Sequence, residues 1–171
     1  MSLGLSDSRY DTAYSTEHFL RATEQMSKDW SKPLAELSHA DFLKIYSKDV
    51  DWFDHAFLIH RKGHVGLEML RERWLTTNQP YNVTVTDIHP TSNGAILEAF
   101  AEGVFARDLY TIKATGKPFT YAMCIRLQFS AETGLVERVD EYYTRAWGTS
   151  VPVSKYKLDD NRAKAEGLPT A

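Results

Sequence analysis

The sequence predicts an α+β fold in which about three N-terminal helices cover one face of a curved antiparallel sheet. Two observations carry this prediction. Between residues 16 and 77, apolar residues recur mostly at spacings of three and four, as they do in amphipathic helices. After Pro80 the period changes to two, and four long strands follow one another with turns between them, as in an antiparallel meander. A short hairpin is predicted ahead of the third helix.

The length and composition point to a single globular domain with tails. The chain has 171 residues, which suffice for one domain with its own core but are few for two. We expect the domain to span residues 16–148, between an N-terminal tail at 1–15 and a C-terminal tail at 149–171, because both ends are polar and lack a clear helical or strand pattern. Aromatic residues make up 12% of the chain, a share that can line a cavity as well as fill a core.

Charge, cysteine content and hydropathy argue against several classes of partner. The formal net charge is -3 and the Lys and Arg residues are scattered, so the basic surface that nucleic acid requires is not expected. The single cysteine, Cys124, rules out an intrachain disulfide and a cysteine-based metal cluster, which fits a reducing compartment. The sequence shows neither a signal-like start nor 18 consecutive apolar residues, so we expect a soluble, cytoplasmic protein without a membrane partner.

Caps and apolar stripes predict the three helices. The first has Thr16 as its N-cap and ends before Pro33, and the second begins after Ser38 and stops before a strand at 49–54. The third follows Gly63. Their inward faces are expected to contain Phe19, Leu20, Thr23 and Met26 in the first, Phe42, Leu43 and Tyr46 in the second, and Val65, Leu67, Leu70 and Trp74 in the third, where Arg71 counts among the outward charges.

Alternation and turns predict the four strands of the meander. They are expected at Tyr81–His89, Ala95–Ala106, Phe119–Phe129 and Leu135–Trp147. The third is the clearest, because its alternation requires one face to be buried. That face consists of Phe119, Tyr121, Met123, Ile125, Leu127 and Phe129.

The segment from Tyr46 to Gly63 is the most informative stretch for function. It is expected to form a helix end, a strand that closes on Asp54, a second short strand and a glycine that starts a helix. Alternation places Val50, Trp52 and Asp54 on one side of the first strand. A carboxylic acid beside a tryptophan in an apolar wall is a candidate proton carrier, because desolvation raises its pKa toward neutral pH.

The order of these elements and the residues within them resemble the nuclear transport factor 2-like superfamily, which includes ketosteroid isomerase, SnoaL-like polyketide cyclases and scytalone dehydratase. The likeness covers roughly residues 30–147, which is most of one domain. Its most specific part is Tyr46, Asp49 and Asp54 followed by Gly63, and its second part is Gly-Lys-Pro-Phe at 116–119 with the later segment 134–143. The resemblance implies a cone-shaped version of the α+β fold.

The resemblance also implies roles for individual residues. Asp54 matches the general base of ketosteroid isomerase, and Glu141 matches an acid/base aspartate of SnoaL-like cyclases. Ile125 matches the isomerase's second, protonated aspartate, so this chain departs from the isomerase where the oxyanion is held. The isomerase's helix tyrosine has no clear counterpart, and the nearest position falls around Trp30. Three residues of one strand are implied to face the cavity: Phe100, Glu102 and Val104.

Each candidate also has a structural interpretation, and both stay open at this point. Asp54 at a strand end can cap the turn into His55, and Glu141 can face solvent. Alternation alone assigns Glu102 to the exposed side of its strand. Tyr121 and Tyr143 can donate hydrogen bonds to an enolate oxygen, with either Glu141 or Glu102 as the partner acid of Asp54, or they can be core tyrosines. Substrate-binding walls are expected from Trp52, Phe100, Met123, Ile125, Val139 and His60.

No metal or cofactor is expected. His55, His60 and His64 fall within ten residues, but His55 and His60 have opposite strand parity and His64 begins a helix, so they do not form a ligand set. A surface position beside Arg61 is favoured for His60, with a cavity position as the alternative. The sequence lacks a glycine-rich phosphate loop and a local Ser-His-Asp or Cys-His arrangement.

These observations favour a cofactor-independent enzyme, a SnoaL-like cyclase, isomerase or dehydratase acting on a hydrophobic carbonyl compound such as a polyketide or terpenoid. The rival is a non-catalytic ligand-binding or dimerisation module of the same fold, with its cone filled by side chains. An epoxide hydrolase is disfavoured, because Arg126 lies on the wrong strand face to join a cavity acid. The resemblance implies a homodimer through the outer face of the sheet, to which the C-terminal tail would add through the alternating Val151, Val153 and Tyr156.

Overall fold

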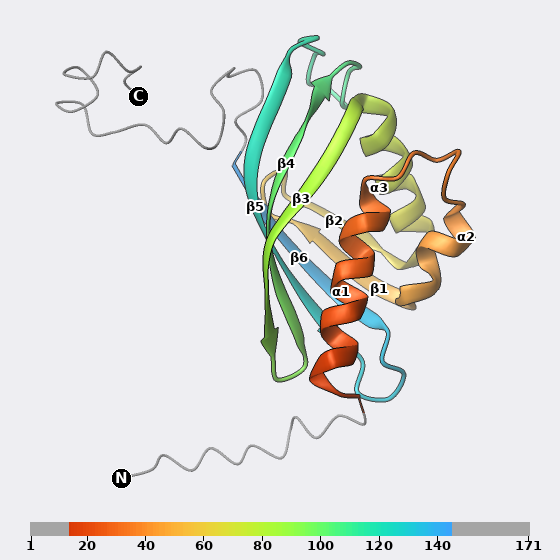
Figure 1. The fold of residues 1–171 in the computed structure, drawn as a ribbon. Coiled ribbons are helices and arrows are strands. Elements are labelled where there is room, and N and C mark those ends of the chain that lie inside the picture. The colour runs from red at the N-terminus through yellow and green to blue at the C-terminus, as the bar shows by residue number, and fades with distance from the viewer. Residues whose placement is uncertain (1–13, 145–171) are drawn as a thin grey trace, which may run out of the picture.

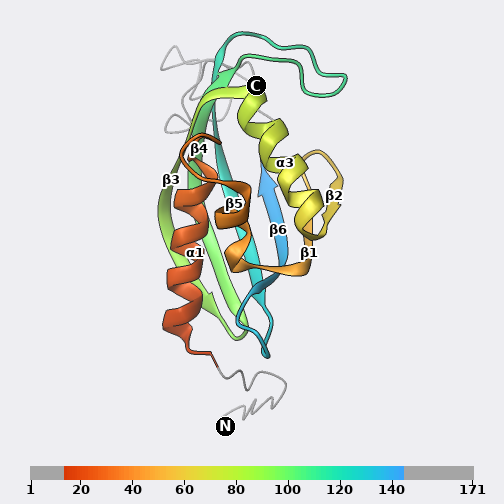
Figure 2. The same cartoon turned by 90° about the vertical axis from the view of Figure 1, so that its right-hand side faces the viewer.

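A computed structural model describes residues 14–144 and confirms the predicted α+β fold (Figure 1). The helices gather on one face of a curved sheet (Figure 2). Apart from Tyr14 and Ser15, the two expected tails lie outside the described residues. The same holds for the end of the last predicted strand at 145–147 and for the alternating residues Val151, Val153 and Tyr156.

The sheet contains β1 (Tyr46–Asp54), β2 (Ile59–Lys62), β3 (Asn78–Thr91), β4 (Gly94–Phe105), β5 (Pro118–Phe129) and β6 (Val136–Tyr143). These six strands lie in the order β2-β1-β6-β5-β4-β3. The pairs from β3 to β6 are antiparallel, as the predicted meander requires, and β1 with β2 forms the predicted hairpin. One pairing departs from the expected antiparallel sheet, because β1 runs parallel to β6. This parallel pair attaches the hairpin to the meander.

The helices are α1 (Thr16–Trp30), α2 (His39–Phe42) and α3 (Gly63–Thr77), with a short 3-10 turn, η2 (Leu43–Ile45), between α2 and β1. α1 packs over β3 and β4, and α3 packs mainly over β1 and β2. The helices therefore cover the inner face of the sheet from its two opposite edges, and the core lies between them (Figure 2).

Two helix boundaries differ from the sequence analysis. The N-cap of α1 is Ser15, whose hydroxyl accepts a hydrogen bond from the backbone N of His18, and Thr16 is the first helical residue. The second helix is shorter than expected, since β1 already begins at Tyr46. Tyr46 is still buried, as predicted, but it reaches the core from a strand.

The face that α3 buries also differs from the predicted one. Val65 is 70% exposed, whereas Arg71, expected to face solvent, is buried. The Arg71 guanidinium donates from Nη1 to the carbonyl of Leu37 and from Nη2 to the carbonyl of Lys32, both at 3.1 Å. Its partners are backbone carbonyls of the connection between α1 and α2, and a pattern of side chains contains no sign of such partners.

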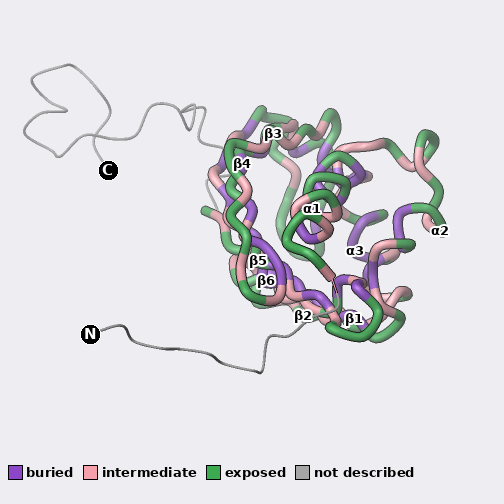
Figure 3. Tube along the Cα trace, turned by 60° about the horizontal axis from the view of Figure 1, so that its bottom comes forward, coloured by how far each residue is buried: buried purple, intermediate pink, exposed green. Residues whose placement is uncertain are grey.

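Burial along the strands follows the predicted alternation (Figure 3). The predicted buried face of β5 is confirmed, and each of its six residues from Phe119 to Phe129 is at most 5% exposed. On β4, Ala99 and Ala101 are buried, and Glu98 and Glu102 on either side of them are exposed. The inner face of the sheet is therefore apolar along β4 and β5.

Gly63 makes the turn from β2 into α3. Its φ is +66°, in the left-handed region where side chains with a Cβ are strained, and a Cβ there would lie 2.9 Å from the carbonyl oxygen of Lys48. The glycine predicted to start the third helix is thus required by both conformation and space.

We expect Gly63→Ala to destabilise the fold by about 2 kcal/mol or more, because left-handed strain of roughly 1–2 kcal/mol adds to the contact with Lys48. Urea unfolding measures the free energy. Gly116→Ala is the matched control, since Gly116 has a φ of +63° with no atom within 4 Å of an added Cβ. Equal losses of unfolding free energy in the two variants would show that the contact with Lys48 does not add to the cost of Gly63→Ala.

Candidate active site

Two carboxylic acids meet where β1 pairs with β6. Asp54 is the last residue of β1, and its partner in the parallel register is Glu141 of β6. Neighbouring strands lie about 4.8 Å apart, so directly opposed side chains on the same face are in close proximity. Both acids line one small pocket on the inner face of the sheet. The prediction that Asp54 lies on the buried side with Trp52 is confirmed, since both are at most 5% exposed.

The Asp54 carboxylate is held by three donors. Its Oδ1 accepts hydrogen bonds from the backbone N of Ala56 at 2.9 Å and of Phe57 at 2.8 Å. Its Oδ2 accepts one from the hydroxyl of Tyr143 at 2.9 Å. Asp54 thus caps the turn after β1 and also faces the pocket, so its two interpretations are compatible. Three donors favour the charged form of a carboxylate.

Glu141 is held differently. Its Oε2 accepts a hydrogen bond from Nε1 of Trp52 at 3.1 Å. Burial raises the pKa of Glu141 to about 8, the negative charge of Asp54 adds to the rise, and the Trp52 bond opposes it. Glu141 is therefore mainly protonated at neutral pH.

The surroundings of the two acids thus favour different protonation states. Asp54 accepts hydrogen bonds suited to an anion, and Glu141 keeps its proton because a second buried negative charge beside Asp54 is unfavourable. A pair of acids in which one is a proton acceptor and the other a proton donor at the same pH is the arrangement that acid/base catalysis uses. Glu141 thus faces the pocket. The mixed polarity of its strand did not predict which face Glu141 would take.

The two candidate tyrosines lie next to each other, and both hydroxyls are engaged. The rings of Tyr121 and Tyr143 stack at 4.7 Å between centroids. The Tyr143 hydroxyl donates to Asp54, and the Tyr121 hydroxyl lies 3.1 Å from that of Tyr81. In this arrangement Tyr143 positions the Asp54 carboxylate, and the Tyr121 hydroxyl is engaged with that of Tyr81.

The pocket around the acids is nearly filled. The centre of a water-sized sphere can occupy only about 10 Å³ of it, which is room for about one water molecule. Its walls are Trp30, Leu70, Trp74, Tyr81 and Tyr143. Of the predicted walls, Trp52, Met123, Ile125 and Val139 are all buried on the inner side of the sheet and belong to the core around the pocket.

The sequence analysis missed the role of Tyr81, Trp74, Leu70 and Trp30 as pocket walls. Leu70 and Trp74 were predicted to face inward, but an inward helix stripe does not distinguish core from pocket. The best signal was at Trp30, the position nearest the isomerase's helix tyrosine, and Trp30 does line the pocket. Tyr81 had no signal beyond its place at the start of a strand.

Two predicted cavity residues of β4 lie on the opposite face of the sheet. Phe100 is 38% exposed and Glu102 is also exposed, so the expectation that they face the cavity is wrong. Alternation explains the error: Ala99 and Ala101 take the inner positions, and their neighbours must point outward. Glu102 therefore does not meet Asp54, which leaves Glu141 as the partner acid.

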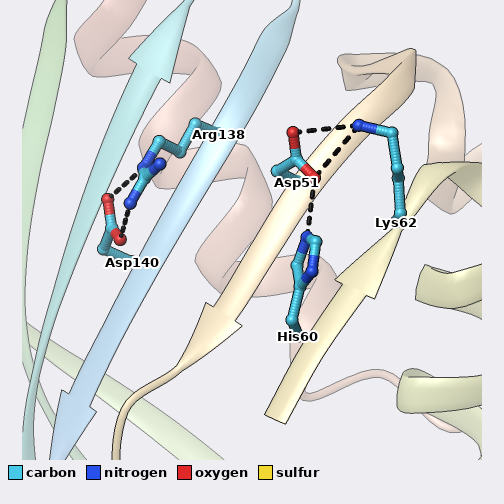
Figure 4. Close-up of polar contacts among 5 residues, drawn as sticks. All are labelled: Asp51, His60, Lys62, Arg138 and Asp140. Carbon is cyan, nitrogen blue, oxygen red and sulfur yellow. Dashed lines mark hydrogen bonds and ion pairs between the residues drawn. The ribbon is translucent and has the colours of Figure 1, made fainter. Parts of the chain in front are cut away.

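His60 also lies away from the pocket. It pairs in register with Phe53, whose ring stacks on the imidazole at 4.3 Å. The ring nitrogen Nε2 of His60 lies 2.7 Å from Oδ1 of Asp51, as Figure 4 shows. The cavity position is thus wrong for His60, and the surface position is correct, because strand parity places His60 and Trp52 on opposite faces.

Within residues 14–144, His, Cys, Asp and Glu side chains do not form any group of three or more that could hold a metal ion. In the same part of the chain, every helix is too short or too polar to cross a membrane.

Comparison with known proteins gives matches of structure only. No protein-family model and no curated protein sequence matches the chain. A protein from Jannaschia sp. CCS1, provisionally assigned as a SnoaL-like polyketide cyclase, matches with a TM-score of 0.66 at 8% identity, over 74% of this chain and 85% of that one. A protein of ketosteroid isomerase-like fold from Catenulispora acidiphila DSM 44928, solved with trimethylamine, matches with a TM-score of 0.62 at 16% identity, over 80% of this chain and 97% of that one. A nuclear transport factor 2-like protein from Anabaena variabilis ATCC 29413 matches with a TM-score of 0.60 at 15% identity, over 78% and 93%.

At these identities the likeness shows the fold alone. The chain has the nuclear transport factor 2-like fold that the sequence resemblance implied. The identity of its reaction has to be argued from Asp54, Glu141 and their surroundings.

The raised pKa of Glu141 makes stability depend on pH. Because the folded protein binds this proton up to about pH 8 and an unperturbed glutamate releases it near 4.5, folding is linked to proton uptake between these values. The free energy of unfolding should therefore fall as pH rises from 5 to 8, by up to about 1.4 kcal/mol per pH unit from this group. Urea unfolding across this range measures the slope.

Glu141→Gln should remove that contribution, since the amide keeps the shape and does not titrate. Asp54→Asn should lower the pKa of Glu141, because the negative charge beside Glu141 is removed. The pH range over which the free energy of unfolding falls should therefore become narrower. Glu102→Gln, on the exposed face, is the control and should leave the slope unchanged. A wild-type slope preserved in Glu141→Gln would contradict the assignment of the proton to Glu141.

Proposed function

We propose that the protein is a cofactor-independent enzyme that moves a proton next to the carbonyl group of a hydrophobic small molecule, as a cyclase, isomerase or dehydratase does. The observation that carries the proposal is the buried pair of Asp54 and Glu141, held in different protonation states by different partners. Strongly shifted acids in a concave site are more frequent at catalytic centres than elsewhere.

The proton step uses both acids. The Asp54 carboxylate accepts a proton from the carbon next to the carbonyl, the electrons of that C–H bond form a C=C bond, and the carbonyl π electrons move to oxygen. The protonated Glu141 carboxyl donates a hydrogen bond to the resulting enolate oxygen. Asp54 then returns the proton to another carbon, as in an isomerisation. Alternatively, as in a cyclisation, the enolate carbon attacks a second carbonyl carbon of the same molecule, the π electrons of that carbonyl move to its oxygen, and this oxygen takes the proton from Asp54.

Two further side chains act on the acids and not on the substrate. Tyr143 donates to Asp54 Oδ2 and fixes its orientation, and Trp52 donates to Glu141 Oε2. Met123, Ile125 and Val139 supply apolar surroundings that keep water from competing for the enolate. Ile125 pairs in register with Glu141, so Glu141 takes over the donor role that an acid at position 125 would have.

A non-catalytic module is the second candidate, and the volume of the pocket favours it. A site for a drug-sized ligand normally exceeds about 300 Å³, and the pocket around Asp54 and Glu141 is far smaller. An enzyme with this structure has to bind a substrate by moving a wall of the pocket, whereas a module needs no such movement. The Catenulispora protein, which holds trimethylamine, shows that this fold can hold a small molecule.

Deuterium exchange separates the two candidates without knowledge of the natural substrate. We expect the wild-type protein in D2O to accelerate loss of the methyl proton signal of acetophenone, an enolisable apolar ketone, over the rate in buffer. Asp54→Asn should lower the catalysed rate by about 100-fold or more, because a general base contributes on that order. Proton NMR follows the signal.

Asp51→Asn is the matched control. Asp51 lies on the same strand but on the outer face, where it contacts His60 and Lys62 (Figure 4), and its loss should leave exchange unchanged. Exchange at the buffer rate in the wild type, or equal rates in wild type and Asp54→Asn, would refute the proton-transfer proposal and favour the module.

We also propose that two copies associate through the outer face of the sheet. Phe100 and Tyr142 are 38% and 48% exposed there, and with Ala122 and Cys124 they line an open groove across β4, β5 and β6. Large apolar side chains gathered on a sheet face favour burial against a partner.

The association is tested by light scattering coupled to size-exclusion chromatography. The wild type should have the mass of a dimer, and Phe100→Glu should shift it to a monomer, because a charge would be buried in the interface. Tyr110→Glu replaces an aromatic residue that is 49% exposed and lies away from the groove, and it should leave the dimer intact. A monomeric wild type would exclude this interface.

A further inference from the structure

A second and much larger cleft adjoins the pocket of the acids. About 510 Å³ of it is open to the centre of a water-sized sphere, within the range of small-molecule sites. It lies between the α1–α2 connection, the last turn of α3 and the start of β3. Tyr81 lines both spaces and is the residue they share.

One wall of this cleft is held in place by part-buried polar contacts. Arg71 donates to the carbonyls of Lys32 and Leu37, which flank the segment 33–35 that forms one wall. The hydroxyl of Ser31, at the start of the same wall, accepts a hydrogen bond from the backbone N of Val83. The cleft is therefore preformed, and binding in it needs no rearrangement of the chain.

The lining of the cleft is uncharged and combines apolar with neutral polar side chains. Among the described residues that form it, none is a Lys, Arg, Asp, Glu or His. Leu34, Leu75 and Pro80 provide apolar surface, and Thr76 and Gln79 are polar but neutral. An anionic ligand would find no cation to compensate its desolvation there, so the lining selects neutral molecules.

Tyr81 forms the boundary between the cleft and the pocket of the acids. Its side chain is only half-buried. Its hydroxyl lies 3.1 Å from that of Tyr121 and also forms a hydrogen bond with the side chain of Trp74, whose ring it meets edge-on at 5.9 Å. The register between β3 and β4 is irregular from Asn78 to Tyr81, so the ring stands at a break in the regular ladder. Rotation about its side-chain bonds disrupts these contacts without disturbing the sheet.

We propose that this cleft binds the apolar body of a neutral carbonyl substrate, and that rotation of Tyr81 joins the cleft to the pocket of Asp54 and Glu141. The inference rests on the proposed function for the identity of the substrate, but binding and gating are measurable without any reaction. It accounts for a pair of acids enclosed in a space that admits about one water molecule.

Binding is tested by NMR titration with acetophenone and benzoate, which differ mainly in charge. We expect acetophenone to bind at least about tenfold more tightly than benzoate. Ala35→Trp should weaken the binding of acetophenone by about tenfold or more, because the indole ring fills the cleft that Ala35 lines. Ala40→Trp, on an exposed position of α2 outside the cleft, should not affect binding. Equal affinity in wild type and Ala35→Trp, or tighter binding of benzoate, would overturn the assignment of the cleft.

Gating is tested by NOEs from acetophenone to labelled leucine methyl groups. Leu34 lines only the cleft and Leu70 only the pocket of the acids. The wild type should show NOEs to both leucines. Tyr81→Phe removes the hydroxyl contacts with Tyr121 and Trp74 and should strengthen the NOE to Leu70. Tyr81→Ala should strengthen it further if that variant folds. NOEs to Leu34 alone in wild type and in Tyr81→Phe would refute the gate.

The same measurements in Asp54→Asn separate this proposal from the proposed function. Acetophenone binding and both NOEs should persist in that variant, because neither depends on the base. If binding and gating are observed while wild-type deuterium exchange stays at the buffer rate, the assignment of the cleft is supported and the proposed enzymatic function is refuted. The reverse result would support the proton chemistry and refute the assignment of the cleft.

Discussion

The parallel pairing of β1 with β6 is the contact on which the candidate site depends. It is the one parallel step among the described strand pairs, and it places the end of an N-terminal hairpin against the last strand of the meander. Because the register sets Asp54 opposite Glu141, two acids that are 87 positions apart in the chain become neighbours on a buried face. A shift of one residue in this register would turn one acid to the outer face, and the two side chains would no longer be neighbours.

The surroundings then convert two similar groups into different ones. Asp54 ends its strand, so the backbone of the following turn provides two donors, and Tyr143 from the neighbouring strand provides a third. Glu141 stands within its strand, where backbone donors are used by the sheet, and it receives a single side-chain donor from Trp52. The position of each acid in its strand thus decides how many donors it meets. Burial and the negative charge of Asp54 raise the pKa of Glu141, and the single donor from Trp52 only partly opposes that rise.

Much of this arrangement was predictable from the sequence, and the failures have identifiable causes. Strict alternation predicted the buried face of β5 and the inward position of Asp54, because the period of a strand is a local property. The resemblance predicted Glu102 and Phe100 in the cavity, whereas the alternation of β4 places both on the outer face. The burial of Arg71 depends on carbonyls of a distant connection, and the role of Tyr81 depends on two cavities that form only when α1, α3 and β3 assemble. Such features belong to tertiary contacts and leave no period in the sequence.

The energetics of the pair argue against a purely structural role. A buried acid that must keep its proton lowers stability at neutral pH relative to an apolar residue of similar size, since burial raises its pKa well above that of the unfolded chain. A scaffold whose cone is filled by side chains would gain stability from an apolar residue in place of Glu141, and Trp52 would then need no acceptor. An acid kept neutral beside an acid held as an anion provides a proton donor and a proton acceptor in one dry space, which packing alone does not require. The small volume of the pocket would by itself fit a filled core, but the paired acids fit the proposed site, which is closed until a substrate enters.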